Sequence, residues 1–252
     1  MNTTLPSLSI VHTFIALQLA GGIGMALILI TTLFSSSAKR NGTWHSFCIS
    51  WIVSALSYCL LFFAGQQTVY DKETPSYGLC LTQAALIYST PPTTGATTFA
   101  LFLDVYWKIN TALSGGPIPS SSSHWILYIV PYILWIILTI SFLVFGHVFP
   151  MTVQRDIANT YCVLNSTVPP VLTSVLVSIF ALMVLTVLGT LFYRLKKSRS
   201  EQFAGFRNNR YLNAFFIRLI LFMILGIIAT CIGLVYAFNR TPGPQYDIAM
   251  AT

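Results

Sequence analysis

Two charged residues, Asp104 and Arg218, lie inside long apolar segments, where an ionised side chain is costly unless it has a partner. Asp104 falls about one helical turn inside the end of its segment, and Arg218 falls at the corresponding edge of another. Equal depth and opposite charge predict an ion pair that joins the two segments. The alternative is that Arg218 reaches lipid phosphate while Asp104 bonds locally, for example to Tyr106 or Lys108.

Five cysteines offer thiol chemistry. Cys48, Cys59 and Cys231 lie within apolar segments and are most simply packing residues. Cys80 lies at the outer end of the third apolar segment, and Cys162 lies in the long loop before the fifth. The topology below assigns both to the oxidising side of a membrane, so a disulfide between them is chemically allowed. Two unpaired thiols are the alternative, because the sequence gives no distance between these residues.

The chain lacks the motifs that mark membrane enzymes and metal sites. It has no HExxH, no GxSxG and no pair of carboxylates within its apolar segments. Its four histidines divide between the two faces of the membrane, so they cannot converge on one metal ion. We therefore expect no enzymatic activity, no metal and no cofactor.

Composition assigns the chain to the membrane proteins. Of its 252 residues, 55% are hydrophobic and only 8% are charged, whereas soluble domains carry about 25% charged residues. A helix of roughly 20 apolar residues crosses the hydrocarbon core and satisfies its own backbone there. The sequence predicts an all-α polytopic helix bundle, a single transmembrane domain over 1–252 with six spans at approximately 9–34, 46–65, 79–107, 125–146, 169–193 and 211–238.

The distribution of positive charge orients these spans. Most of the 13 Lys and Arg residues lie in the first, third and fifth connections and at the base of the sixth span. The positive-inside rule assigns that side to the cytoplasm and both termini to the outside, at the plasma membrane. Basic loops of this kind contact anionic lipid, so the lipid bilayer is the expected partner and nucleic acid is not.

The third predicted span contains two consecutive prolines, Pro91 and Pro92. Each removes one backbone donor, and a helix in a membrane must satisfy the freed carbonyls locally. The threonines that follow are expected to bond back to carbonyls of their own helix. These are Thr93, Thr94, Thr97 and Thr98.

The order of these features resembles that of the G-protein-coupled receptors. The shared features are an outside amino terminus, a cysteine at the start of span three, a second cysteine after span four and a basic third inner loop. The stretches TWHSFCISWIVSALSYCLLFFAGQQ and GLCLTQAALIYSTPPTTGATTFALFLDVYWKI resemble the uncharacterised receptor-like proteins of mushroom-forming fungi. The segment RNNRYLNAFFIRL is more distantly similar to fungal lipopeptide pheromone receptors. Such receptors have a seventh helix, so 239–252 is expected to be an outer tail that begins a missing one.

The resemblance implies a receptor that senses an extracellular or lipophilic ligand and signals through a cytoplasmic heterotrimeric G protein. Where rhodopsin-like receptors carry Asp-Arg-Tyr, this chain has Asp104, Val105 and Tyr106, so valine replaces the arginine that contacts the G protein. The pair of Asp104 with Arg218 would be a polarity-reversed lock between the third and sixth helices. The alternative function is a six-span channel, a transporter or a non-signalling membrane scaffold.

Two groups of residues are the candidates for binding. A ligand is expected between the outer halves of the spans, at Tyr58, Gln66, Gln83, Tyr88, Thr173 and Tyr236. Interhelical hydrogen bonding is the alternative role for that group. The α subunit of the G protein is expected to contact Val105, Tyr106, Arg194, Lys196, Lys197, Arg199, Arg207 and Arg210. For the basic residues, the alternative is that they only hold the loop inside and touch anionic lipid.

Asn165, in an Asn-Ser-Thr sequon of an outer loop, is the expected glycosylation site.

Overall fold

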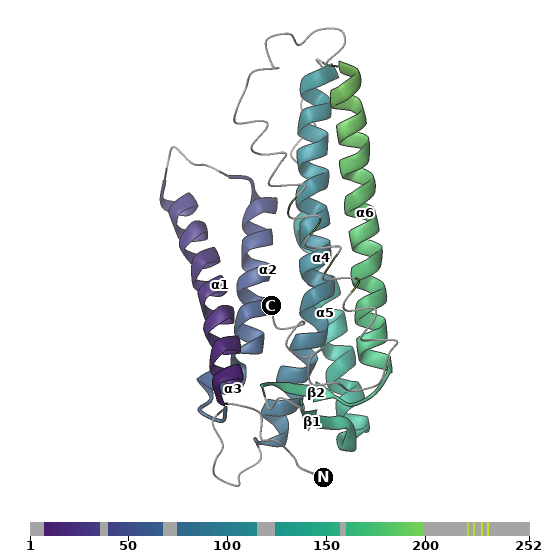
Figure 1. Ribbon diagram of the computed structural model, residues 1–252. Coiled ribbons are helices and arrows are strands. Elements are labelled where there is room, and N and C mark those ends of the chain that lie inside the picture. The colour runs from purple at the N-terminus through teal and green to yellow at the C-terminus, as the bar shows by residue number, and fades with distance from the viewer. Residues whose placement is uncertain are drawn as a thin grey trace.

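The described part of the chain is mostly helical. A computed structural model describes residues 8–35, 40–67, 75–114, 124–156, 160–198, 221, 224, 228 and 231. Within these residues it has six α-helices and one short hairpin (Figure 1). The bounds are α1 Leu8–Phe34, α2 Gly42–Tyr58, α3 Leu60–Phe63, α4 Tyr77–Ser114, α5 His124–Val148, the 3-10 helix η3 Pro150–Thr152, β1 Val153–Arg155, β2 Cys162–Leu164 and α6 Val168–Ser198.

The predicted spans correspond to helices wherever the structure describes them. The second span is divided, because α2 ends at Tyr58 and α3 begins after the intervening Cys59. The third continues past the predicted end at 107 to Ser114, just before the Gly-Gly-Pro sequence at 115–117. The sixth predicted span, 211–238, and the predicted tail, 239–252, lie outside the continuously described residues.

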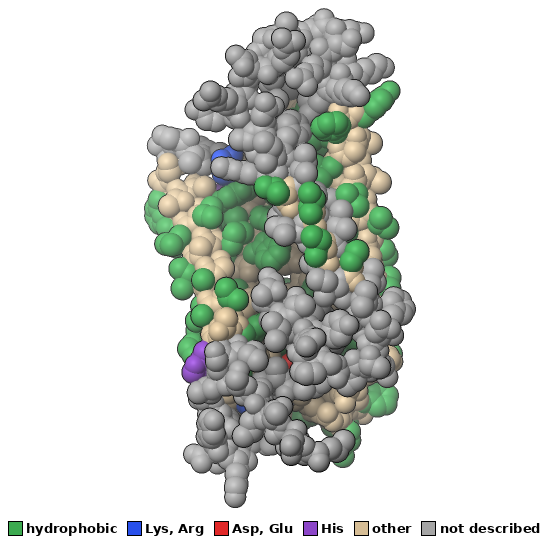
Figure 2. All heavy atoms as spheres, in the orientation of Figure 1, with side chains coloured by type: hydrophobic (Ala, Val, Ile, Leu, Met, Phe, Trp, Pro, Cys, Tyr) green, Lys and Arg blue, Asp and Glu red, His purple; other side chains and the backbone are tan. Residues whose placement is uncertain are grey.

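Three of the described helices are long and apolar enough to cross a membrane, namely Val11–Phe34, Trp125–Val148 and Val168–Arg194. Their most apolar windows are only 11%, 17% and 11% buried inside the molecule. Large apolar side chains such as Leu33, Ile137 and Leu182 are therefore exposed, and Figure 2 shows hydrophobic side chains along both flanks of the described part. Surfaces of this kind are stable against lipid hydrocarbon and not against water.

Helix α4 is the centre of the bundle. It packs against α2, α5 and α6 and against both strands of the hairpin (Figure 1). A helix surrounded by protein can carry polar side chains that bond to its neighbours, which explains why α4 is less apolar than the three helices above. Its buried polar residues are Gln83, Ser89, Thr90, Thr93, Thr94, Thr97, Thr98 and Asp104.

The two prolines of α4 leave the carbonyls of Ile87 and Tyr88 without their usual helical donors, since each would accept from the residue four positions ahead. Thr90 Oγ1 donates to the Ile87 carbonyl at 3.4 Å. Thr173 Oγ1, from α6, donates to the Tyr88 carbonyl at 3.0 Å. Both freed acceptors thus receive hydroxyl donors, one from the same helix and one from its neighbour.

The predicted back-bonding of the threonines is confirmed. Thr93 donates to the Ser89 carbonyl at 2.9 Å, and Thr94 donates to the Pro91 carbonyl at 2.9 Å. Thr97 and Thr98 both donate to the Thr94 carbonyl, at 3.1 and 2.6 Å. Further hydroxyls join neighbouring helices in the pairs Ser50–Thr97, Ser89–Thr139 and Ser46–Tyr132.

The hairpin closes one end of the bundle. Strands β1 and β2 are antiparallel, with Val153 opposite Leu164 and Arg155 opposite Cys162. Leu164 is buried in an apolar cluster formed with residues of α3, α4 and α5. This end is called the disulfide end below, and the opposite end, which holds Asp104, is called the Asp104 end.

Candidate functional site

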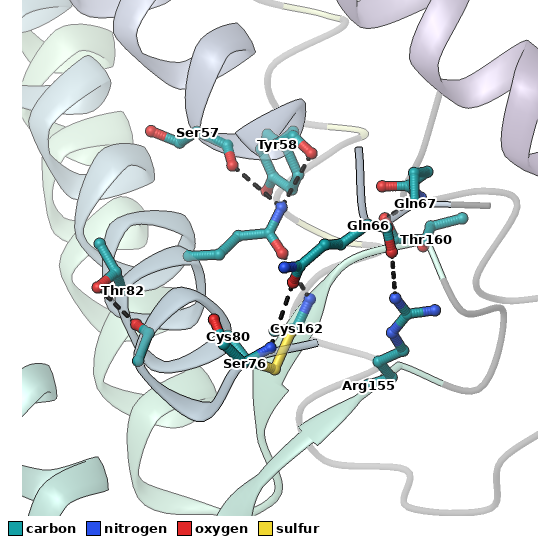
Figure 3. Close-up of a disulfide and its surroundings, with 12 residues drawn as sticks. Ser57, Tyr58, Gln66, Gln67, Ser76, Cys80, Thr82, Arg155, Thr160 and Cys162 are labelled. Atoms are coloured by element: carbon teal, nitrogen blue, oxygen red, sulfur yellow. Dashed lines mark hydrogen bonds between the residues drawn. A yellow bond between two sulfur atoms is a disulfide. The ribbon is translucent and has the colours of Figure 1, made fainter. Parts of the chain in front are cut away.

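A disulfide joins Cys80, in the first turn of α4, to Cys162, the first residue of β2 (Figure 3). Their Cα atoms are 5.3 Å apart, and 82 residues separate them in the sequence. This is the pairing that the sequence allows. It ties the hairpin before α6 to the central helix of the bundle.

Gln83 lies one turn after Cys80 and connects three elements. Its Nε2 donates to the carbonyls of Ser57 and Tyr58, at 3.3 and 3.1 Å. Its Oε1 accepts from the backbone N–H of Cys162 at 3.0 Å. The last carbonyls of a helix lack intrahelical donors, so Gln83 caps the end of α2 while it holds β2 against α4. The side chain is fully buried, with 0% exposed.

Tyr58, at the end of α2, belongs to a cluster of three aromatic rings. Its ring centroid is 5.8 Å from that of Phe14 and 5.6 Å from that of Tyr161. Phe14 and Tyr161 are themselves 5.8 Å apart. Rings at these separations attract one another beyond the effect of their burial. The cluster joins α1, α2 and the residue just before β2.

Gln66 and its neighbour Gln67 hold the other side of the hairpin. The Arg155 guanidinium donates to the Gln66 carbonyl, and Gln67 Nε2 donates to the Thr160 carbonyl at 2.6 Å. Gln66 Oε1 accepts from the backbone N–H of Ser76 at 3.2 Å. Burial lowers the pKa of Arg155 from its ordinary value because it removes water from the charged group. These contacts fasten β1 to the segment that follows α3.

Tyr88 and Thr173 connect α4 to α6 through the hydrogen bond described above, and the Tyr88 ring lies 5.7 Å from that of Phe142 in α5. Each described ligand candidate thus has a protein partner, which is the alternative role that the sequence left open. Tyr236 lies outside the described residues. Ligand binding at these positions stays a prediction.

Asp104 anchors the other end of the bundle. Its Oδ2 accepts from Asn41 Nδ2 at 3.0 Å, from Thr43 Oγ1 at 3.0 Å and from Lys108 Nζ at 2.6 Å. Asn41 is the N-cap residue of α2, and Asp104 is only 1% exposed. A carboxylate at a helix N-terminus is favoured by the partial positive charge there. Asp104 therefore joins α4 to the start of α2.

The predicted lock between Asp104 and Arg218 stays a prediction, since Arg218 lies outside the described residues. The local bond from Lys108 belongs to the alternative that the sequence analysis left open. The sequence does not predict the contacts that Asn41 and Thr43 make with Asp104. The Asn-Gly-Thr sequence before an apolar segment does predict a helix start, but only the packed structure shows which carboxylate it meets.

Arg194 of α6 is one of the residues predicted to contact the G protein. Its guanidinium donates to Asn110 Oδ1 and lies 5.9 Å from the Tyr106 ring centroid, a distance typical of cation–π attraction. Arg194 is exposed, and Val105 is half-buried. The side chains of Lys196 and Lys197, and all of Arg199, Arg207 and Arg210, lie outside the described residues.

Asn165, the predicted glycosylation site, follows β2 directly and is exposed. Its Nδ2 donates to Gln154 Oε1 at 3.2 Å, and its backbone N–H donates to the Thr152 carbonyl. The side chain is exposed, which a glycosylation site requires. Modification there stays a prediction.

Metal ligands do not gather within the described residues, where no group of three or more His, Cys, Asp or Glu side chains could hold an ion. Comparison with known proteins identifies no family for this chain. No protein-family model and no curated protein matches the chain. The structure shows a mostly helical protein with three helices able to cross a membrane and a disulfide at one end of its bundle.

Proposed function

We propose that the protein is a membrane receptor of the seven-helix type, which senses an extracellular or lipophilic ligand and signals to a cytoplasmic heterotrimeric G protein. The observation that carries the proposal is the Cys80–Cys162 disulfide, which joins the first turn of the central helix to the hairpin before α6. It supports the receptor-like order of cysteines and spans that the sequence resembles.

Two observations support the orientation that this function requires. Disulfides persist in oxidising compartments, which favours the outside for the disulfide end. Arg40, Lys108 and Arg194 are all near the Asp104 end, beside Asn41, Asp104 and Asn110 respectively. Positive charge accumulates on the cytoplasmic side of membrane proteins. The Asp104 end is then the face that would meet the G protein.

At that face, Arg194 supplies an exposed guanidinium next to Tyr106. Val105 stands where rhodopsin-like receptors carry arginine, and Arg194 of α6 brings a cation beside this part of α4. An exposed arginine of this kind suits the acidic or carboxyl-terminal elements of a Gα subunit. The same residue would otherwise only contact anionic lipid.

The test is ligand-dependent nucleotide exchange on a fungal Gα subunit in membranes that contain the full chain. Exchange that rises with a ligand, and falls when Arg194 is replaced by alanine, supports the proposal. A matched control is Thr190→Val, an exposed position one turn earlier in α6 whose hydroxyl bonds only to its own helix. Ion currents or substrate flux without exchange would overturn the proposal and favour a channel or transporter.

The side of the carboxyl terminus is a second test. An epitope fused after Thr252 is expected to be labelled on intact cells if the chain has six spans with the amino terminus outside. Labelling only after permeabilisation would contradict six spans and favour an odd number. With the amino terminus outside, the result decides whether the number of spans is even or odd, independently of any signalling assay.

A further inference from the structure

The turn that joins α5 to the hairpin exposes apolar side chains. Residues 148–151, which we call the apolar turn, include the end of α5 and the start of η3. Val148 is 60% exposed, Phe149 is 53% exposed and Met151 is 87% exposed. A connecting turn that meets water is normally polar. The composition of this turn therefore calls for a neighbour other than water.

The backbone around the apolar turn is supplied with hydrogen bonds from within the protein. Each of the four carbonyls of residues 149–152 accepts at least one. In the order of these acceptors, the donors are the N–H and Oγ1 of Thr152, the N–H of Val153, the amide of Gln154 and the N–H of Asn165. A backbone carbonyl without a partner is costly away from water. These four carbonyls do not depend on water for a partner.

The apolar turn continues the lipid-facing side of α5. The helix is long and apolar enough to cross a membrane, and its most apolar window is only 17% buried. Side chains three or four positions apart share one face of a helix. Five exposed aliphatic residues follow that spacing and lead directly into the turn, namely Ile133, Ile137, Ile140, Val144 and Val148.

The length of α5 brings the turn to the level of the lipid headgroups. Its 25 residues form a helix about 37 Å long. A bilayer is about 30 Å thick across its hydrocarbon core and about 40–45 Å thick with its headgroup regions. Trp125, in the first turn of α5, is 55% exposed, and tryptophan gathers at the headgroup level. With Trp125 at one interface, Val148 lies at the other.

We propose that the apolar turn is inserted into the bilayer at the boundary between headgroups and acyl chains, with the side chains of Phe149 and Met151 among the lipids. Gln154, which is exposed, and Arg155 come directly after the apolar run and mark where the chain leaves the lipid. The hairpin is then held at two places, by lipid before β1 and by the disulfide at the start of β2. The inference requires that α5 crosses a membrane, but it requires no ligand and no G protein.

A fluorescent label at position 151 tests the insertion. Met151→Cys is made in the full-length protein with the exposed Cys231 replaced by serine, and it is labelled with a nitrobenzoxadiazole group. Cys48 and Cys59 are 1% and 0% exposed and stay unlabelled in the folded protein. The protein is placed in phosphatidylcholine nanodiscs, one copy per disc. The lipids carry a quenching doxyl group close to the headgroup, or deep in the acyl chain, or not at all.

Two further labelled positions calibrate the depth. Ile137→Cys, in the middle of α5, should be quenched more strongly by the deep doxyl group than by the shallow one. Gln154→Cys, on β1, should be quenched by iodide in the water. The label at 151 should be quenched about twofold more strongly by the shallow doxyl group than by the deep one, and about threefold less by iodide than the label at 154.

Three results would overturn the inference. Iodide quenching at 151 equal to that at 154, with no doxyl quenching, would place the turn in water. Protection from iodide without doxyl quenching would mean that protein covers the turn. Protection that appears only with two copies per disc would make a second copy the occupant. Phe149→Cys replaces Met151→Cys as the labelled position if peptide mapping finds the Cys80–Cys162 disulfide mispaired.

Discussion

Replacing Gln83 with methionine is predicted to destabilise the protein through the end of α2 and the start of β2 together. Methionine is similar in length and fills the same buried space, so the change removes hydrogen bonds without leaving a large cavity. It leaves the Cys162 N–H without its Gln83 acceptor, and it removes the amide donor from the carbonyls of Ser57 and Tyr58.

The size of the effect follows from the burial of these groups. A buried donor or acceptor that loses its partner costs about 1–3 kcal/mol, and here one N–H and a shared pair of carbonyls are affected. We expect a loss of about 2–4 kcal/mol in the free energy of unfolding. For a chain of this length that corresponds to a fall in Tm of about 5–15 °C.

The assay uses two cysteines of the chain itself. Cys48 and Cys59 are 1% and 0% exposed, so a thiol-reactive dye becomes fluorescent only as the purified protein unfolds on heating. Exposed Cys231 is replaced by serine to remove its background signal. Tryptophan fluorescence, from the five tryptophans of the chain, gives the same Tm without a label.

Thr82→Val is the matched control. Thr82 neighbours Gln83 in α4 but is exposed, and its hydroxyl donates only to the Gly78 carbonyl of its own helix (Figure 3). Its replacement should shift Tm by less than about 2 °C. A Gln83→Met protein that melts with the parent, with its disulfide intact, would refute the assignment of Gln83 as the connector of the three elements.

Three further predictions concern other parts of the bundle. Asp104→Asn removes the charge that pairs with Lys108. The change should lower the free energy of unfolding by about 1–3 kcal/mol, measured in a thermal melt. Replacing Cys80 and Cys162 by serine should lower it by up to about 4 kcal/mol, since the disulfide closes a long loop; an unchanged melt would contradict this. Gly146→Ala puts a Cβ in steric overlap with a methyl of Leu81 and should cost about 1–3 kcal/mol, whereas Gly189→Ala meets nothing within 4 Å and should be neutral or stabilising.

The helices and the disulfide could be predicted because their signals are local or chemical. Apolar runs of about 20 residues identify spans directly. Cys80 and Cys162 stood out because only these two fell on the oxidising side of the predicted topology. The break of the second span at Cys59 could not be predicted, since no proline or glycine marks it in the sequence SYCLL.

The partners of the polar residues were harder to predict. Thr173 is a predicted ligand contact, and in the structure its hydroxyl supplies the donor that Pro92 withholds from the Tyr88 carbonyl. The need for such a donor follows from the sequence, because a proline always frees the carbonyl four residues back. Which helix supplies the hydroxyl depends on the packing of α6 against α4, and periodicity alone does not determine that packing.

The sequence by itself indicated a helical membrane protein, predicted its long apolar helices and allowed the pairing of Cys80 with Cys162, because these depend on composition, on length and on the chemistry of one residue type. Only the tertiary structure decided that α4 is central, that Asp104 meets the start of α2 and that Tyr161 packs against the cluster that contains Cys59. Those contacts join residues that are far apart in the chain. Their formation depends on how helix surfaces fit together, and no local pattern of residues encodes that fit.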